Sequence, residues 1–139
     1  MKIAITGGGN CYALSLAREA ISPGHEVIGL GRNPMKPSCF SMEFASQRRD
    51  FAYHVSPVGS DNCLRFLDYF SPDWIVNFAA QGEGAASFSS NAWPYFYNTN
   101  VADLVHFTAE LAKRSYLKRF VQIGSSEVYG SPDHAALES

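Results

Sequence analysis

The chain has 139 residues, of which 46% are hydrophobic and 17% charged, and its formal net charge is −2 at pH 7. This length fits one domain with a substantial core, and the scattered basic residues give no electrostatic support to nucleic-acid binding. The opening apolar run is too short for a signal peptide and no segment reaches membrane-spanning length, so we expect a cytoplasmic protein without a membrane partner. The low charged fraction indicates surface covered by more chain or by a second subunit, or else an ordinary large core.

The three cysteines, Cys11, Cys39 and Cys63, have none of the spacings of zinc sites or redox motifs. We therefore expect free thiols of a reducing compartment and no metal site.

Apolar residues recur along the chain with alternating strand and helix periods. Strands are predicted over residues 2–6, 26–30, 51–55, 74–80 and 119–124. Helices are predicted over residues 13–21, 62–70 and 95–114. The sequence of residues 42–48 is compatible with a further short helix. The expected apolar face of the longest helix consists of Val101, Leu104, Val105, Thr108, Leu111 and Ala112.

Strands that alternate with helices require parallel pairing and right-handed crossovers. We therefore predict an α/β fold, a Rossmann-type doubly wound parallel sheet in the order 3-2-1-4-5, incomplete at the C-terminus. Ligands of such sheets bind beyond the carboxyl ends of the strands, where the strand order reverses.

A glycine-rich turn follows the first predicted strand and precedes the first helix. Bare backbone there lets a pyrophosphate approach the amides, and the start of the helix favours negative charge. The residues expected to hold the phosphates are Gly7, Gly9, Asn10, Cys11 and Tyr12. Against the spacing G-x-x-G-x-x-G, Gly7 fits, while Asn10 and Ala13 stand at the second and third positions. A plain tight turn is the alternative.

The end of the second strand carries Gly31 and Arg32, where an enzyme that uses NAD usually has Asp or Glu. An arginine pairs with a 2′-phosphate that a carboxylate would repel, so NADP is favoured over NAD. Alternatively, Arg32 is a solvated loop residue. His54 and Val55 end the third strand and are expected beside the adenine through their backbone.

Four segments of the chain resemble the extended short-chain dehydrogenase/reductase family of nucleotide-sugar enzymes, the NAD-dependent epimerases and dehydratases. They are Thr6-Gly7-Gly8, the run from Pro72 to Gln81, Thr99-Asn100-Val101 and the run from Phe120 to Gly130. The resemblance covers almost the whole chain. The chain departs from the family at Asn10 and Ala13, which replace glycines, and at His54-Val55, where Asp and an aliphatic residue are usual.

The resemblance implies roles for residues at the fourth and fifth strand ends. Phe78, Ala79, Ala80 and Gln81 would pass along the cofactor, and the helix that carries Asn100 would pack over the site. Ser125 stands where the family keeps the Ser or Thr that hydrogen-bonds the sugar 4-hydroxyl, and Ser126 and Glu127 follow it as further catalytic candidates. That helix, 95–114, would also support a homodimer.

The run Ser125-Ser126-Glu127-Val128-Tyr129-Gly130 is most similar to GDP-mannose 4,6-dehydratases, in which such an acid moves the C5 proton. The resemblance therefore implies a nucleotide-sugar 4,6-dehydratase or epimerase with transient hydride transfer at C4. A decarboxylase or reductase of the same family, and a non-catalytic NADP-binding module, stay open. Glu127 could also only cap a loop.

The family's Tyr-x-x-x-Lys motif does not occur in this sequence. Tyr116 is followed by Lys118, and Tyr129 has no Lys four residues later. We therefore expect residues 1–139 to be the N-terminal, NAD(P)-binding part of such an enzyme, without the substrate lobe, and unable to turn over alone.

Overall fold

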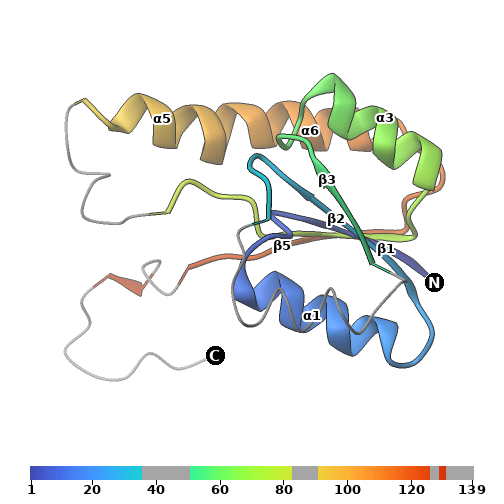
Figure 1. The fold of residues 1–139 in the computed structure, drawn as a ribbon. Coiled ribbons are helices and arrows are strands. Elements are labelled where there is room, and N and C mark those ends of the chain that lie inside the picture. The colour runs from blue at the N-terminus through green and yellow to red at the C-terminus, as the bar shows by residue number, and fades with distance from the viewer. Residues whose placement is uncertain (36–50, 83–90, 126–128, 131–139) are drawn as a thin grey trace.

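The computed structural model describes residues 1–35, 51–82, 91–125 and 129–130, which form a parallel five-stranded sheet with helices on both faces (Figure 1). The strands are β1 (Lys2–Thr6), β2 (Glu26–Gly31), β3 (Phe51–Val55), β4 (Trp74–Asn77) and β5 (Arg119–Gln122). Their order is β3-β2-β1-β4-β5, which confirms the predicted order. β1 pairs in parallel with β2 and with β4, so the strand order reverses at β1.

One helix covers the lower face of the sheet in Figure 1, and the others cover the upper face. The helical segments are α1 (Cys11–Ile21), α3 (Asp61–Phe70), α5 (Trp93–Tyr97), the π-helical segment η1 (Asn98–Ala102) and α6 (Asp103–Leu111). α1 lies below the sheet, whereas α3, α5 and α6 lie above it. Two of these helices have side-chain caps: Asn10 accepts from the amide of Ala13 at 2.8 Å, and Ser60 accepts from the amide of Cys63 at 3.2 Å.

Successive side chains of the strands are buried on opposite faces of the sheet. Ile3 and Ile5 of β1 pack with Leu14 of α1, whereas Ala4 between them belongs to the cluster that packs against α3 and α6. The second cluster includes Phe107, whose side chain is fully buried. Both faces of the central strands are therefore apolar, as a parallel sheet requires.

The predicted single helix over residues 95–114 is wrong in detail. The helical stretch begins at Trp93, passes through η1 and ends at Leu111. The wider π turn shifts the phase of the helix surface relative to a regular 3.6-residue repeat. Phe107, which the predicted apolar face omits, lies four residues before Leu111 on α6 and is buried with it, whereas Val105 is 62% exposed. Pairing of two chains through this helix stays a prediction.

The fourth and fifth strands are also shorter than their apolar runs. β4 ends at Asn77 and β5 at Gln122, because the residues after them leave the sheet and form the site described below. Within the described ranges, no helix is both long and apolar enough to cross a membrane.

Candidate functional site

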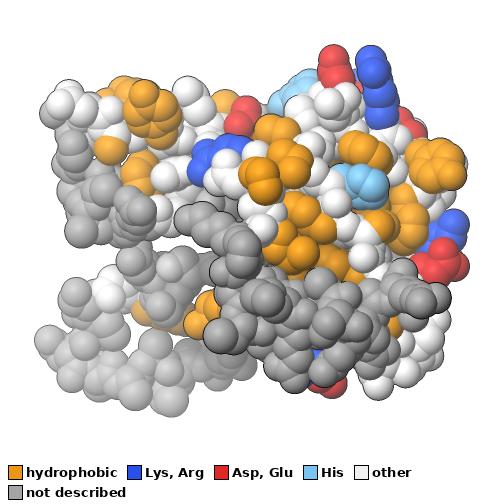
Figure 2. Space-filling model, viewed as in Figure 1, with side chains coloured by type: hydrophobic (Ala, Val, Ile, Leu, Met, Phe, Trp, Pro, Cys, Tyr) orange, Lys and Arg blue, Asp and Glu red, His pale blue; other side chains and the backbone are white. Residues whose placement is uncertain are grey.

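A groove of about 320 Å³ lies at the carboxyl ends of the strands, where the strand order reverses. Four turns and one helical stretch supply its walls: the turn after β1, the ends of β2, β3 and β4, and the start of α6. In the space-filling view, hydrophobic side chains gather near the centre of the face shown, with a basic side chain next to them (Figure 2). Among the lining residues, Val58 and Phe78 offer apolar surface and Arg32 a positive charge.

The glycine-rich turn forms one wall of this groove through Gly7, Gly9 and Asn10. Gly7 has a φ of +70°, and a Cβ on it would lie 2.6 Å from the backbone nitrogen of Ala79, so a side chain fits here neither in conformation nor in space. Asn10 donates its side-chain amide to the carbonyl of Gly7 at 3.0 Å while it caps α1. The turn is thus held by its own asparagine.

Three backbone amides of this turn are available to a ligand. The N–H groups of Gly9, Cys11 and Tyr12 donate no hydrogen bond within the described part of the chain, and the last two belong to the first turn of α1, whose amides have no helical partner. The side chains of Cys11 and Tyr12 are exposed and do not line the groove. Any role of these two residues is therefore that of their backbone.

Arg32 reaches across the groove from the end of β2 towards the segment after β4. Its Nη2 donates to Oε1 of Gln81 at 3.0 Å. None of the carboxylates in the described ranges forms an ion pair with Arg32. As far as the described residues go, the charge of the guanidinium is therefore not compensated, and the group has donors beyond the one that Gln81 accepts from.

The segment after β4 passes along the groove, where Phe78, Ala79 and Ala80 line it. Its start is fixed by the fully buried Asn77, whose Oδ1 accepts from the amide of Ala79 at 3.1 Å and from the hydroxyl of Thr6. The Nδ2 of Asn77 donates to Gln122 Oε1 at 2.7 Å. A chain of hydrogen-bonded polar side chains thus joins the carboxyl ends of β1, β4 and β5.

Asn100 holds the end of the same segment from η1. Its Oδ1 accepts from the amide of Gln81 at 2.7 Å, and its Nδ2 donates to the carbonyl of Gln81 at 3.2 Å. Both backbone groups of Gln81 are thus paired with one side chain. The contact ties the π-helical segment to the groove wall, so Asn100 positions the segment that the resemblance places along the cofactor.

A second groove, of about 660 Å³, continues beyond Gln81 and Asn100. Ser125 lines it, together with the residues that follow β5, Ile123 and Gly124. The structure therefore brings the first catalytic candidate to a cavity that shares Ala79 and Ala80 with the first groove. Ser126 and Glu127 lie outside the described residues.

The third strand contributes a different residue from the two expected. The ring of His54 stacks on Phe66 of α3 with centroids 4.1 Å apart, and Val55 is 52% exposed; neither lines the groove. Tyr53, one residue earlier, lines it, and burial raises the pKa of its hydroxyl, which stays a donor at neutral pH. The period of two along a strand puts Tyr53 and His54 on opposite faces.

Two further groove residues were not among the expected site residues, although Thr99 belongs to a segment that carries the family resemblance. Asp103 and Thr99, one helical turn apart, line the groove, as do Pro57 and Val58. Asp103 is the one carboxylate among the described lining residues. Only the packing of the η1–α6 stretch against the β3 end brings this acid to the site.

The same fold occurs in solved structures of enzymes with bound nucleotides. A UDP-glucose-4-epimerase from Stenotrophomonas maltophila, with bound NAD and formylated UDP-arabinopyranose, matches 99% of this chain and 40% of its own, with a TM-score of 0.83 and 15% identity. The dTDP-glucose 4,6-dehydratase of Bacillus anthracis in complex with NAD matches 100% of this chain and 42% of its own, with a TM-score of 0.77 and 19% identity. At these identities the likeness shows the fold.

A third solved structure, the Bordetella bronchiseptica enzyme WbmG in complex with NAD, matches 96% of this chain and 40% of its own, with a TM-score of 0.74 and 24% identity. The chain thus spans about two-fifths of the length of these structures. No curated protein matches the sequence. The model of the NAD dependent epimerase/dehydratase family matches residues 3–139. The chain therefore belongs to the NAD dependent epimerase/dehydratase family.

Proposed function

We propose that this chain binds NADP in the groove, as the cofactor-binding part of a nucleotide-sugar 4,6-dehydratase or epimerase. One observation carries the proposal: Gly9 and Arg32 line the same groove, and within the described residues the amide of Gly9 donates no hydrogen bond and the guanidinium of Arg32 forms no ion pair. A dinucleotide with a 2′-phosphate has anionic groups that require both kinds of donor.

The lining residues fit the parts of this cofactor in order. The amides of Gly9, Cys11 and Tyr12 at the start of α1 would hold the pyrophosphate, where the helix favours negative charge. Arg32 would hold the 2′-phosphate, because no carboxylate stands at the end of β2 to repel it. The adenine would lie towards Val58 and Asp103, whose carboxylate can accept from the exocyclic amine.

The reaction is supported by the second groove. A nicotinamide bound there would supply a reversible hydride acceptor for C4 of the sugar. Ser125 lines that groove and would hydrogen-bond the sugar 4-hydroxyl, as its resemblance to the family's Ser or Thr implies. Glu127 follows two residues later and would move the C5 proton in a dehydratase. Solved structures of both an epimerase and a dehydratase share this fold.

Replacement of Arg32 tests the cofactor. We expect Arg32→Ala to raise the Kd of NADPH at least about tenfold, because charge-assisted hydrogen bonds to the 2′-phosphate are lost. The Kd of NADH should change less than about twofold. Fluorescence titration of both dinucleotides measures the two constants. Arg65→Ala, an exposed position on α3, is the matched control; equal weakening of both dinucleotides by Arg32→Ala would contradict the assignment.

Replacement of Glu127 tests the reaction, in a complete enzyme that has this chain as its N-terminal part. We expect Glu127→Gln to abolish exchange of the sugar C5 proton with solvent while hydride transfer at C4 continues, because the amide cannot take up the proton. Mass spectrometry of the sugar nucleotide in D2O measures the exchange. Exchange that survives in the variant rules out Glu127 as the base, and no exchange in the unmodified enzyme favours an epimerase.

A further inference from the structure

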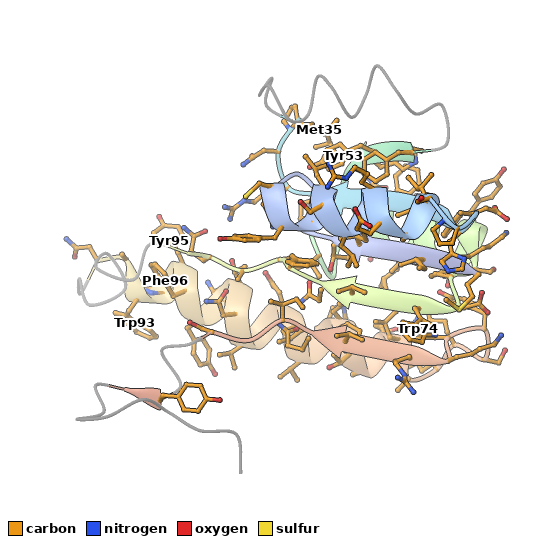
Figure 3. All side chains as sticks on the ribbon, turned by 90° about the horizontal axis from the view of Figure 1, so that it is seen from below. Met35, Tyr53, Trp74, Trp93, Tyr95 and Phe96 are labelled. Atoms are coloured by element: carbon orange, nitrogen blue, oxygen red, sulfur yellow. The ribbon has the colours of Figure 1, made fainter. Side chains whose placement is uncertain are left out.

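Tyr53 of β3 lies against both the glycine-rich turn and the segment that follows β2. Its hydroxyl donates to the carbonyl oxygen of Asn33 at 2.8 Å, directly after Arg32. The side chain lies beside the end of β2 (Figure 3). Tyr53 is the residue of β3 that lines the groove.

The ring of Tyr53 occupies a slot that only glycines leave open. A Cβ on Gly31 would lie 2.2 Å from the Tyr53 hydroxyl oxygen, closer than any real contact allows, and one on Gly9 would lie 3.1 Å from it. The ring therefore packs against the glycine-rich turn and against the end of β2 at once. A side chain at Gly31 would displace the ring from this slot.

The segment that Tyr53 holds has few other restraints. The carbonyl of Gly31 accepts from the amide of Ser56 at 2.7 Å, which fixes the residue before Arg32. The next residue after Asn33 is Pro34, which has no N–H to donate. In the described ranges, the backbone of Arg32 and Asn33 is therefore held on its far side by the Tyr53 hydroxyl.

We propose that Tyr53 is a positioning residue that aims Arg32 and so sets the preference for NADP over NAD; this inference rests on the proposed function. Because the backbone of Arg32 is fixed on both sides, its side chain loses less conformational freedom when the guanidinium pairs with a phosphate. Tyr53 acts through Arg32, and only a ligand with a 2′-phosphate gains from it.

The variant Tyr53→Phe removes the hydroxyl and keeps the ring in its slot. We expect the Kd of NADPH to rise about fivefold, because one neutral hydrogen bond that orients Arg32 is lost, while the Kd of NADH stays within about twofold. A merely structural role would weaken both dinucleotides equally, and that result, or no change in either, would overturn the inference. Tyr69→Phe is the control, because Tyr69 is 92% exposed on α3.

A double variant tests whether Tyr53 acts through Arg32. In the Arg32→Ala background, Tyr53→Phe should cause no further loss of NADPH binding, because the group that it aims is gone. A further loss would overturn the inference and place the hydroxyl on the ligand itself.

Failure of the proposed function gives a different pattern. An unmodified chain without preference for NADPH over NADH would refute the NADP assignment, and the inference with it. A chain that prefers NADPH, loses this preference in Arg32→Ala and keeps it in Tyr53→Phe would refute only the inference.

Discussion

At the scale of single residues, Gly7 has the most restricted position in the groove. Its φ of +70° lies in the region that favours glycine. A Cβ on Gly7 would also lie 2.6 Å from backbone atoms of Phe78 and Ala79, so the turn can approach this segment only without a side chain. Conformation and space both exclude any other residue. The chain offers Gly24 for comparison, which has a φ of +88° and open space around it.

A comparison of substitutions at Gly24 and Gly7 separates the cost of backbone strain from the cost of steric overlap. We expect Gly24→Ala to lower the free energy of unfolding by about 1 kcal/mol, because the left-handed conformation costs that much. Gly7→Ala should cost about 2 kcal/mol more, because its Cβ also displaces backbone. Urea denaturation measures both values. Equal losses would show that the backbone after β4 moves aside freely.

Residue identities in the groove were only partly predictable. Gly7 and Asn10 follow an apolar strand and open a helix, and this position in the chain, more than their spacing, led to the prediction of a phosphate-binding turn. Tyr53 was missed because its neighbours His54 and Val55 stand at the family's adenine position, although the alternation of strand residues separates Tyr53 from His54. Asp103 could not be found, because neither its position in the chain nor its neighbours point to the groove.

At the scale of elements, an ion pair joins α3 to the segment directly beyond α6. Arg114, directly beyond α6, donates from Nε and Nη2 to the two carboxylate oxygens of Asp68 on α3, at 3.0 and 3.3 Å. Tyr116 donates its hydroxyl to Asp68 at 2.9 Å. The hydrogen bond from Arg114 holds the pKa of Asp68 below its ordinary value. The contact therefore favours the folded state wherever Asp68 is charged.

This pKa shift predicts a pH-dependent stability difference. A lowered folded pKa contributes stability above the unfolded pKa of about 4, and the contribution is lost as the pH falls through the folded value. We expect Asp68→Asn to cost about 0.5 kcal/mol at pH 7, since Asp68 is half exposed and screened by solvent. The deficit should vanish at low pH.

Urea denaturation between pH 7 and pH 2.5 measures this deficit. Glu19→Gln is the control, since Glu19 and its partner Arg18 are both well exposed. A deficit that stays constant over the range would mean that the hydrogen-bond geometry, and not the charge, stabilises the contact.

The helical stretch from Trp93 to Leu111 shows why element boundaries were harder to predict than element types. Apolar spacing indicated a helix there, and a helix is present. The spacing assumes 3.6 residues per turn throughout, whereas η1 is π-helical and carries Asn100, which bonds both backbone groups of Gln81. Such wide turns are frequent at functional sites. The spacing of apolar residues within one helix carries no information about a contact with Gln81, which lies 19 residues away in the chain.

At the scale of the whole molecule, the sheet was predictable because topology rules leave few choices. Alternating strands and helices demand parallel pairing, right-handed crossovers fix the side of each helix, and the ligand edge follows from the order 3-2-1-4-5. The reaction was not predictable to the same degree. The family includes epimerases and dehydratases on one fold, and this chain spans about two-fifths of the solved structures that it matches.

The contact between Arg32 and Gln81 has a consequence for how fast a ligand can arrive. A carboxamide orients the guanidinium without neutralising it, so an incoming dianion need not break an ion pair before it binds. The positive field of Arg32 extends about 8 Å at physiological ionic strength. Encounter with a phosphorylated dinucleotide should accordingly be steered, and its association rate constant should fall as salt is added. Gln81 keeps the arginine extended across the groove while leaving its charge free to attract.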